Sequence, residues 1–240
     1  MNLKAHLYTC LLQFLLGIAC ISCSQNKRIN AYFSEEKFID SLNIGLKGKT
    51  KVEIEKFRND STQDNMIILS FYEQDSVWNY KTQKNIGNTW RPMNRFYFDK
   101  DGITGIGAEI SDFNNDGFND FTYQSGIAGR GGNTIKTLFI YDPKSKNFIH
   151  IKNSDHYPNL SYNSKLNCIN SLILTGSTTT SFLKIKKDSL DEFARVDVSD
   201  TILVTEKNAA GNFKIIEKKK FEGNDVDFYN GFRNYKPLEY

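Results

Sequence analysis

Short apolar segments separated by turn residues constrain this chain more than any other feature of its sequence. Turn sequences recur at intervals of roughly 8–15 residues, for example at Asp99–Gly102, Asp142–Lys146 and Asn208–Asn212. We therefore predict a mostly β chain, an antiparallel β-sandwich or flattened barrel of about nine strands. The expected strands lie at 52–57, 66–72, 96–98, 135–141, 147–152, 166–174, 178–186, 201–206 and 213–218.

One short N-terminal helix is expected before the first of these strands. Ser34 is a helix-capping residue type, and Glu35 and Glu36 after it are acids that favour a first helical turn. Gly45 and Gly48 would end the helix. The apolar residues between recur at helical spacing, at Phe38, Ile39, Leu42 and Leu46.

The composition is that of a globular protein. Of the 240 residues, 39% are hydrophobic and 25% are charged, which excludes a fibrous or wholly disordered chain. The formal net charge of +3 is too small to indicate a nucleic-acid-binding surface. We expect residues 34–240 to form a single domain.

Residues 1–22 are predicted to be a signal peptide. Lys4 supplies a positive start, and the apolar stretch Leu7–Ser22 is short for a transmembrane helix. The sequence around Cys23 resembles the lipobox of bacterial lipoproteins, which implies that this cysteine becomes the lipid-bearing N-terminus. Cys20 is a competing lipidation site, and an ordinary secretory signal peptide is the alternative.

The lipobox resemblance also implies a location. Ser24 follows the cysteine, whereas an aspartate there commonly signals inner-membrane retention in that family. We therefore expect an outer-membrane lipoprotein of the cell envelope, held to the membrane through its lipid alone, with residues 23–33 as a polar tether. Cys168 would be the one unmodified cysteine left, so no internal disulfide is expected and the fold depends on its core.

The segment 112–120 has the composition of a calcium-binding loop. Calcium takes six to eight hard oxygen ligands, and Gly117 stands where a tight loop needs a positive φ. Tyr123 stands where an EF-hand would have its bidentate glutamate, so the loop is not an EF-hand. A metal-free Asn/Asp/Gly turn is the alternative. The expected ligands are Asp112, Asn114, Asp116, the Phe118 backbone carbonyl and Asp120.

The charges of this loop also favour a bound cation. Its three carboxylates lie within nine residues and repel one another when ionised. The nearest basic residues in the sequence, Lys100 and Arg130, lie outside the loop. Ca²⁺ is therefore the expected cofactor, in preference to Mg²⁺ with its stricter octahedral geometry.

The loop resembles the calcium loop of FG-GAP and VCBS repeat proteins, but it occurs once, so a propeller is not expected. The loop and the residues after it together resemble a family of small bacterial lipoproteins. The features that carry this resemblance are the glycine-rich stretch Gly126–Asn133, the strand Leu138–Tyr141 and Phe148. That family is similar to the periplasmic inhibitors of invertebrate-type lysozyme and includes immunity proteins, which implies a β-sandwich.

The resemblance also implies a partner-binding element. Such inhibitors insert a Ser-Gly-x-Tyr loop into the lysozyme cleft, and this chain has Ser125 and Gly126, with Ala128 in place of the tyrosine. Arg130 in the same stretch could pair with a catalytic carboxylate of the partner. Ser125, Gly126 and Arg130 are therefore the expected partner-binding residues.

No sequence motif indicates an enzyme. The chain lacks a Gly-x-Ser-x-Gly, a His-Glu-x-x-His and a phosphate-binding loop. His150 is expected on a strand surface and His156 in a loop. The sequence leaves open a pair of catalytic carboxyl groups such as glycosidases use, since any two acidic residues can lie close together in the fold.

The expected function is therefore non-catalytic: a lipid-anchored, calcium-binding envelope protein that binds and inhibits a lysozyme or related peptidoglycan hydrolase. The alternative is an envelope module that binds glycan or protein and uses the calcium only for structure. A glycan module would present an exposed aromatic groove, for which Trp78, Trp90 and Tyr80 are the candidates.

Overall fold

The computed structural model describes residues 32–60, 62–223, 229 and 231–235. The predicted signal peptide, Cys20 and Cys23 lie outside these residues. The described part is mostly β, and its strands form three open antiparallel sheets, consistent with a β-sandwich and not closed into a barrel. No helix within the described residues is long and apolar enough to cross a membrane.

Each sheet is built from consecutive strands. The N-terminal sheet contains β1 (Phe33–Asp40), β2 (Thr50–Arg58), β3 (Asn65–Asn79) and β4 (Lys84–Lys100), in that order. The middle sheet contains β5 (Glu109–Ser111), β6 (Asp120–Ala128), β7 (Asn133–Asp142) and β8 (Asn147–Ile151), in that order. The C-terminal sheet, in the order β14 to β9, contains β9 (Ser161–Asn163), β10 (Cys168–Leu174), β11 (Thr178–Lys186), β12 (Ser189–Val198), β13 (Thr201–Lys207) and β14 (Phe213–Lys220). Two short 3₁₀ turns, η1 (Gly129–Gly131) and η2 (Ser154–His156), complete the described elements.

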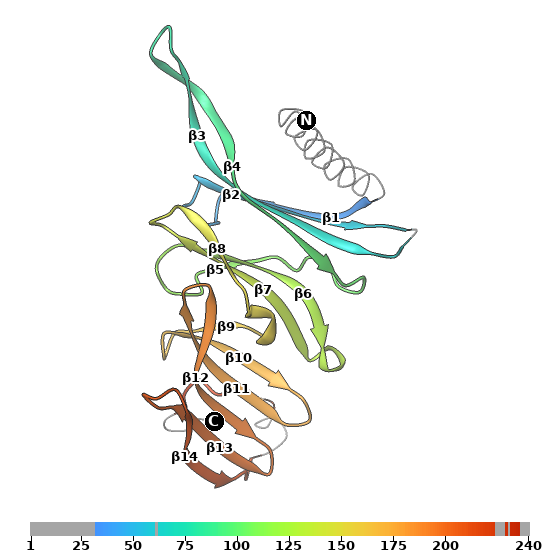
Figure 1. Cartoon of the computed structure of the whole chain (residues 1–240), viewed down its shortest axis with the longest axis vertical. Coiled ribbons are helices and arrows are strands. Elements are labelled where there is room, and N and C mark those ends of the chain that lie inside the picture. Colours follow the sequence, from blue (N-terminus) through green and yellow to red (C-terminus); the bar gives the residue numbers. More distant parts are fainter. Residues whose placement is uncertain (1–31, 61, 224–228, 230, 236–240) are drawn as a thin grey trace, which may run out of the picture.

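The middle sheet lies between the other two (Figure 1). Its strand β7 shows why: Phe139 and Tyr141 belong to the core shared with the N-terminal sheet, whereas Leu138 and Ile140 belong to the core shared with the C-terminal sheet. Successive side chains of a strand point to opposite faces, so both faces of β7 are buried. The apolar run 138–141 is the sequence signature of such a doubly covered strand.

The predicted N-terminal helix is wrong. Residues Phe33–Asp40 form β1, which pairs antiparallel with β2. The apolar residues at helical spacing do not share a buried face, because Phe38 packs against the core while Ile39 and Leu42 are exposed. The Asp40 carboxylate accepts backbone hydrogen bonds in the turn that follows the strand, so the chain changes direction there.

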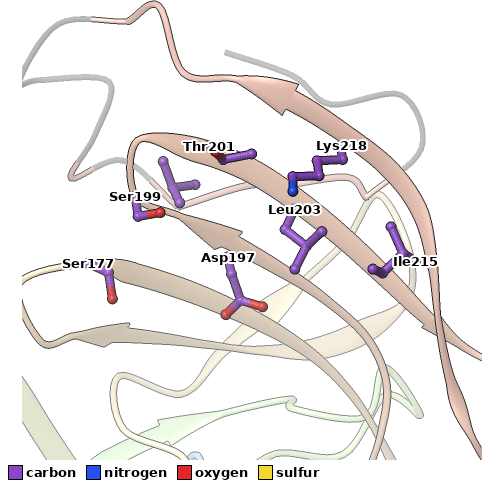
Figure 2. Close-up of a pocket in the computed structure, with 8 residues that line it drawn as sticks. Ser177, Asp197, Ser199, Thr201, Leu203, Ile215 and Lys218 are labelled. Carbon is purple, nitrogen blue, oxygen red and sulfur yellow. The ribbon is translucent and has the colours of Figure 1, made fainter.

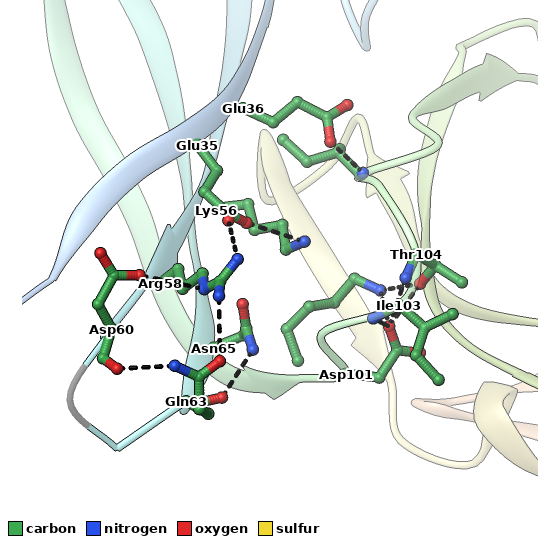
Figure 3. A network of polar contacts seen from close by, with 12 residues as sticks. Glu35, Glu36, Lys56, Arg58, Asp60, Gln63, Asn65, Asp101, Ile103 and Thr104 are labelled. Atoms are coloured by element: carbon green, nitrogen blue, oxygen red, sulfur yellow. Dashed lines mark hydrogen bonds and ion pairs between the residues drawn. The ribbon is translucent and has the colours of Figure 1, made fainter.

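A network of charged side chains joins the N-terminal sheet to the segment that leads into β5 (Figure 3). Glu36 of β1 accepts a hydrogen bond from the Ile106 backbone N–H at 2.8 Å. Lys100, at the end of β4, has a fully buried side chain and donates to Asp101 at 3.1 Å and to Thr104. Burial lowers the pKa of the Lys100 ammonium, against the raising effect of Asp101. These contacts fix the chain just before it enters the 112–120 loop.

This network makes an acid-stability prediction. Although partial burial acts to raise the pKa of Asp101, hydrogen bonds from Thr104 and Lys100 lower it to about 2. Because the folded-state pKa lies below the unfolded value, the stabilisation is complete above about pH 4 and is lost as the pH falls toward 2. We expect Asp101→Asn to remove this component, about 1 kcal/mol after allowance for solvent screening. Urea unfolding between pH 2 and 5 measures the free energy of unfolding of both proteins. If this free energy fell equally steeply with decreasing pH in Asp101→Asn and in the unchanged protein, the prediction would be contradicted.

Candidate functional site

The 112–120 loop connects β5 to β6 and is closed by its own backbone. The Asp112 carboxylate accepts hydrogen bonds from the N–H groups of Asp116, at 3.2 Å, and Gly117, at 2.9 Å. The Asp116 carboxylate accepts from the Asn114 amide and from the Phe118 N–H, both at 2.9 Å. Gly117 has a φ of +88°, which confirms the positive φ expected there. The oxygen-bearing side chains therefore face the inside of one tight turn.

Asp120 ends the loop and is fully buried. One carboxylate oxygen accepts from the Phe113 N–H at 2.8 Å, and the other accepts from the Tyr141 N–H of β7 at 2.9 Å. Burial, together with the nearby carboxylates of Asp116 and Asp112, raises the pKa of Asp120 to about 8, against the lowering effect of these two hydrogen bonds. Asp120 thus ties the loop to the centre of the middle sheet.

The loop also contacts the N-terminal sheet. The Gly45 N–H donates to the Asn119 carbonyl at 2.8 Å, and the Asn119 amide donates to the Asn43 carbonyl at 2.9 Å. The Phe118 ring lies 5.5 Å from the Tyr141 ring. The loop therefore contacts both the β1–β2 connection of the N-terminal sheet and strand β7 of the middle sheet. Its conformation depends on how these two sheets pack against each other.

The oxygen atoms of the loop are of the kind that bind a hard cation, but they are not yet arranged around one. Carboxylates, an amide oxygen and a backbone carbonyl are the ligands that calcium prefers. Asp112 and Asp116 are close enough to raise the pKa of Asp120, and among the described residues no lysine or arginine forms an ion pair with the three. The described residues do not, however, bring three acidic, histidine or cysteine side chains together as a ready metal cluster. A cation would have to draw in carboxylate oxygens that now accept N–H groups.

The expected partner-binding residues are separated by the structure. Ser125 and Gly126 lie within β6, where Gly126 pairs with Ile135, rather than in an open loop. Arg130 lies in η1, the turn that joins β6 to β7, and it is exposed with a φ of +55°. The hairpin tip, residues 129–132, therefore presents Arg130 alone of the three.

Two asparagines that sequence reasoning missed hold this tip. The Asn133 side chain exchanges hydrogen bonds with the Leu174 backbone of β10, at 2.8 and 2.9 Å. The Asn159 amide donates to the carbonyls of Gly132, at 3.0 Å, and Leu172, at 2.8 Å. Their partners are up to 41 residues away in the sequence, so no local pattern marks them.

The 112–120 loop and the hairpin tip lie at opposite ends of β6. The strand runs over nine residues from Asp120 to Ala128, which spans about 26 Å at the usual rise per residue. A cation in the loop therefore cannot contact Arg130 or a partner group bound to its guanidinium. Its effect on such a partner would have to pass through β6.

One hollow of the described surface lies in the C-terminal sheet, away from the 112–120 loop. Figure 2 shows this hollow, of about 330 Å³, at the end of the C-terminal sheet, where Asp197 and Lys218 are the titratable residues of its described lining. Asp197 already accepts a hydrogen bond from Thr179 at 2.6 Å. His150, expected on a strand surface, is instead half-buried beside the rings of Phe98 and Phe139. Burial lowers the pKa of His150.

The aromatic candidates lie together on one hairpin. Trp78 and Tyr80 are exposed on and just beyond β3, and Trp90 is half-buried on β4. Lys51 of β2 places its ammonium 4.2 Å from the centre of the Tyr72 ring and 5.3 Å from that of Trp90. Trp78 and Tyr80 therefore lie toward the free end of the hairpin, and Trp90 lies near Lys51 at its base.

Comparisons with known proteins add little. No family model matches the chain. No curated protein matches it. Among solved structures, a Xanthomonas type IV secretion system related protein is similar over 78% of this chain and 93% of its own, with 14% sequence identity and a TM-score of 0.43. A likeness of this size identifies neither a family nor an activity.

Proposed function

We propose that the protein is a lipid-anchored, calcium-binding protein of the cell envelope that binds and inhibits a lysozyme-like peptidoglycan hydrolase and has no catalytic role of its own. The observation that supports this most is the tip of the β6–β7 hairpin. Arg130 is the exposed charged side chain of a tip whose base is fixed by Asn133 and Asn159. A tip held in one conformation binds with a smaller entropic cost than a mobile loop.

The chemistry of the partner suits this tip. Hydrolases that cleave glycosidic bonds carry two carboxyl groups in an open cleft. The guanidinium of Arg130 could make a bidentate pair with one of them, and the narrow hairpin would keep the glycan out. In this mechanism the 112–120 loop binds Ca²⁺ and stiffens the start of β6. The calcium supports the hairpin from the opposite end of β6.

Inhibition assays with an Arg130 variant test the proposal. We expect the processed protein, expressed with its own N-terminus, to inhibit at least one member of a panel of lysozymes and envelope muramidases near stoichiometrically. Arg130→Asn should weaken this inhibition about 30-fold, the effect of losing one central interface residue. Asparagine tolerates the positive φ of this position, so the loss would report the guanidinium and not backbone strain.

The matched control is Arg91→Ala, which removes an exposed arginine from the N-terminal sheet. It should inhibit as the unchanged protein does. No inhibition of any hydrolase in the panel, with calcium or with chelator, would overturn the proposed function. Equal inhibition by Arg130→Asn would overturn the role of the hairpin tip.

A further inference from the structure

The β3–β4 hairpin extends beyond the rest of the N-terminal sheet. The pairing of β2 with β3 ends at Thr50 and Glu73, and beyond Gln74 the two strands pair only with each other. We call residues 74–90 the arm; it rises above the rest of the described chain in Figure 1. A two-stranded hairpin by itself is only marginally stable in water. An arm of this length is therefore a feature that the core does not explain.

The two faces of the arm differ in chemistry. Arg91 forms ion pairs with Glu73 and Asp75, which places these charged residues on one face. The opposite face carries Trp90 and, by strand alternation and the pairing register, the residues Gln74, Ser76, Trp78 and Asn88. This second face, the aromatic face, holds rings and amides and no charged residue between Gln74 and Trp78.

The aromatic face is accessible to a ligand. Trp78 is 52% exposed, and Tyr80 at the tip is 92% exposed. At the base, the cation of Lys51 lies over Trp90 and forms an ion pair with Glu53 at 2.7 Å, so the charge there is balanced. Exposed rings next to uncharged hydrogen-bonding side chains suit a ligand with apolar C–H faces and many hydroxyl groups.

The edges of the arm are unsuited to an added strand. Pro92, which lies on β4 two residues below the base of the arm, cannot donate a backbone hydrogen bond. Within the arm, the register of the two strands shifts between Val77 and Trp78, and a further shift lies just below its base, between Phe71 and Tyr72. Such irregularities disfavour pairing with another chain. Recognition along the arm would therefore use the side chains of its aromatic face.

We propose that the aromatic face of the arm is a binding site for a neutral oligosaccharide. Trp78 is four residues from Gln74, the partner of Trp90 across the strands, so the two rings are about 13 Å apart along the arm. A single sugar cannot contact both rings, whereas an extended chain of sugars can stack on each. Ser76 and Asn88 lie between the two rings on the same face, and Gln74 lies beside Trp90, where its amide oxygen accepts a hydrogen bond from Lys49 at 3.0 Å. The Ser76 hydroxyl and the two amides can bond the hydroxyl groups of the sugar. This site is separate from the hairpin tip that carries Arg130.

The arm provides its own spectroscopic probe, because the chain has two tryptophans and both lie on the arm. The experiment titrates the processed protein with chitohexaose and with cellohexaose, which are neutral, and with polygalacturonate, which is acidic. Tryptophan fluorescence and calorimetry follow binding. We expect saturable binding of a neutral hexasaccharide with a change in fluorescence. Trp78→Ala and Trp90→Ala should each weaken it about tenfold, the loss expected for one stacking contact.

Two controls test the face and the residue type. Asp75→Asn changes the opposite face of the arm, and Phe213→Ala removes an exposed ring from the C-terminal sheet; both should bind as the unchanged protein does. Arg130→Asn should also leave sugar binding intact, so failure of the inhibitor proposal and failure of this one are distinguishable. The site is overturned if neither neutral sugar binds, if only polygalacturonate binds, or if both tryptophan variants bind normally. It is also overturned if sedimentation shows that the aromatic face is buried between two copies of the chain.

Discussion

Asp120→Ala is expected to lower the free energy of unfolding by about 3–5 kcal/mol, the largest effect of any single carboxylate in the described fold. The side chain is fully buried, and its two oxygens satisfy the N–H groups of Phe113 and Tyr141. Alanine would leave both donors without an acceptor in the centre of the middle sheet and would open a cavity beside them. Urea unfolding followed by circular dichroism at pH 7, with chelator present, measures the loss independently of any metal.

The matched control is Asp142→Ala. This aspartate also accepts backbone hydrogen bonds, from Lys144 and Ser145, but it does so at the exposed turn between β7 and β8. Because water can replace the lost acceptor there, its removal should cost much less than the removal of Asp120. Equal losses for the two variants would show that Asp120 does not hold the loop to β7 as the structure indicates.

The strands could be predicted from the sequence where the apolar pattern was continuous. β3, β7 and β11 lie where the apolar runs predicted them, because buried strands need many apolar residues whatever their partners. β12 was missed although its side chains alternate between buried and half-buried along its whole length. Its inward positions include Glu192, buried beside Arg195, and Ala194. Because such residues have low strand propensity, the alternating pattern of β12 is not visible as an apolar pattern in the sequence, although its pairing with β11 and β13 makes it a strand.

The first strand shows the opposite failure. The sequence from Ser34 has a cap, acids and apolar residues at helical spacing, all local signals of a helix. The structure uses the acids otherwise: Glu35 forms an ion pair with Lys56 of β2 at 3.0 Å, and Glu36 bonds the Ile106 backbone. Tertiary partners far along the chain overrode a weak local preference. Ser125 and Gly126, expected in a partner-binding loop, instead lie in β6, which pairs with β7 as far as Ala128 and Asn133.

The candidate site was predictable in composition but not in arrangement. The spacing of oxygen side chains in 112–120 is a local property, and the loop closes as that spacing indicates. The hydrogen bonds that attach the loop to Tyr141 and to Gly45 depend on which strands become neighbours in the fold. The residues of the loop itself do not indicate these distant partners. The distance between the loop and Arg130 arises from the nine-residue length of β6, a strand that was not among those predicted from the sequence.

Calcium is expected to raise the melting temperature of the processed protein by about 5–10 °C. A ligand that binds only the folded state at 100 times its dissociation constant stabilises by about 2.7 kcal/mol, and each kcal/mol corresponds to about 2–4 °C for a chain of this size. The physical cause is that the ion stabilises the charged form of Asp120, which burial and the nearby carboxylates of Asp116 and Asp112 disfavour. Differential scanning fluorimetry in calcium and in chelator measures the shift, and magnesium should give a smaller one.

Asp116→Ala separates calcium binding from folding. Asp116 is exposed, and its carboxylate bonds only within the loop, so its loss should change the melting temperature in chelator very little. In calcium the variant should melt where it does in chelator, because one of the three carboxylates that attract the ion is gone. Asp155→Ala, another exposed aspartate outside the loop, should keep the full calcium shift. A calcium shift that survives in Asp116→Ala would place any bound calcium elsewhere, and its absence from the unchanged protein would leave 112–120 as a metal-free turn.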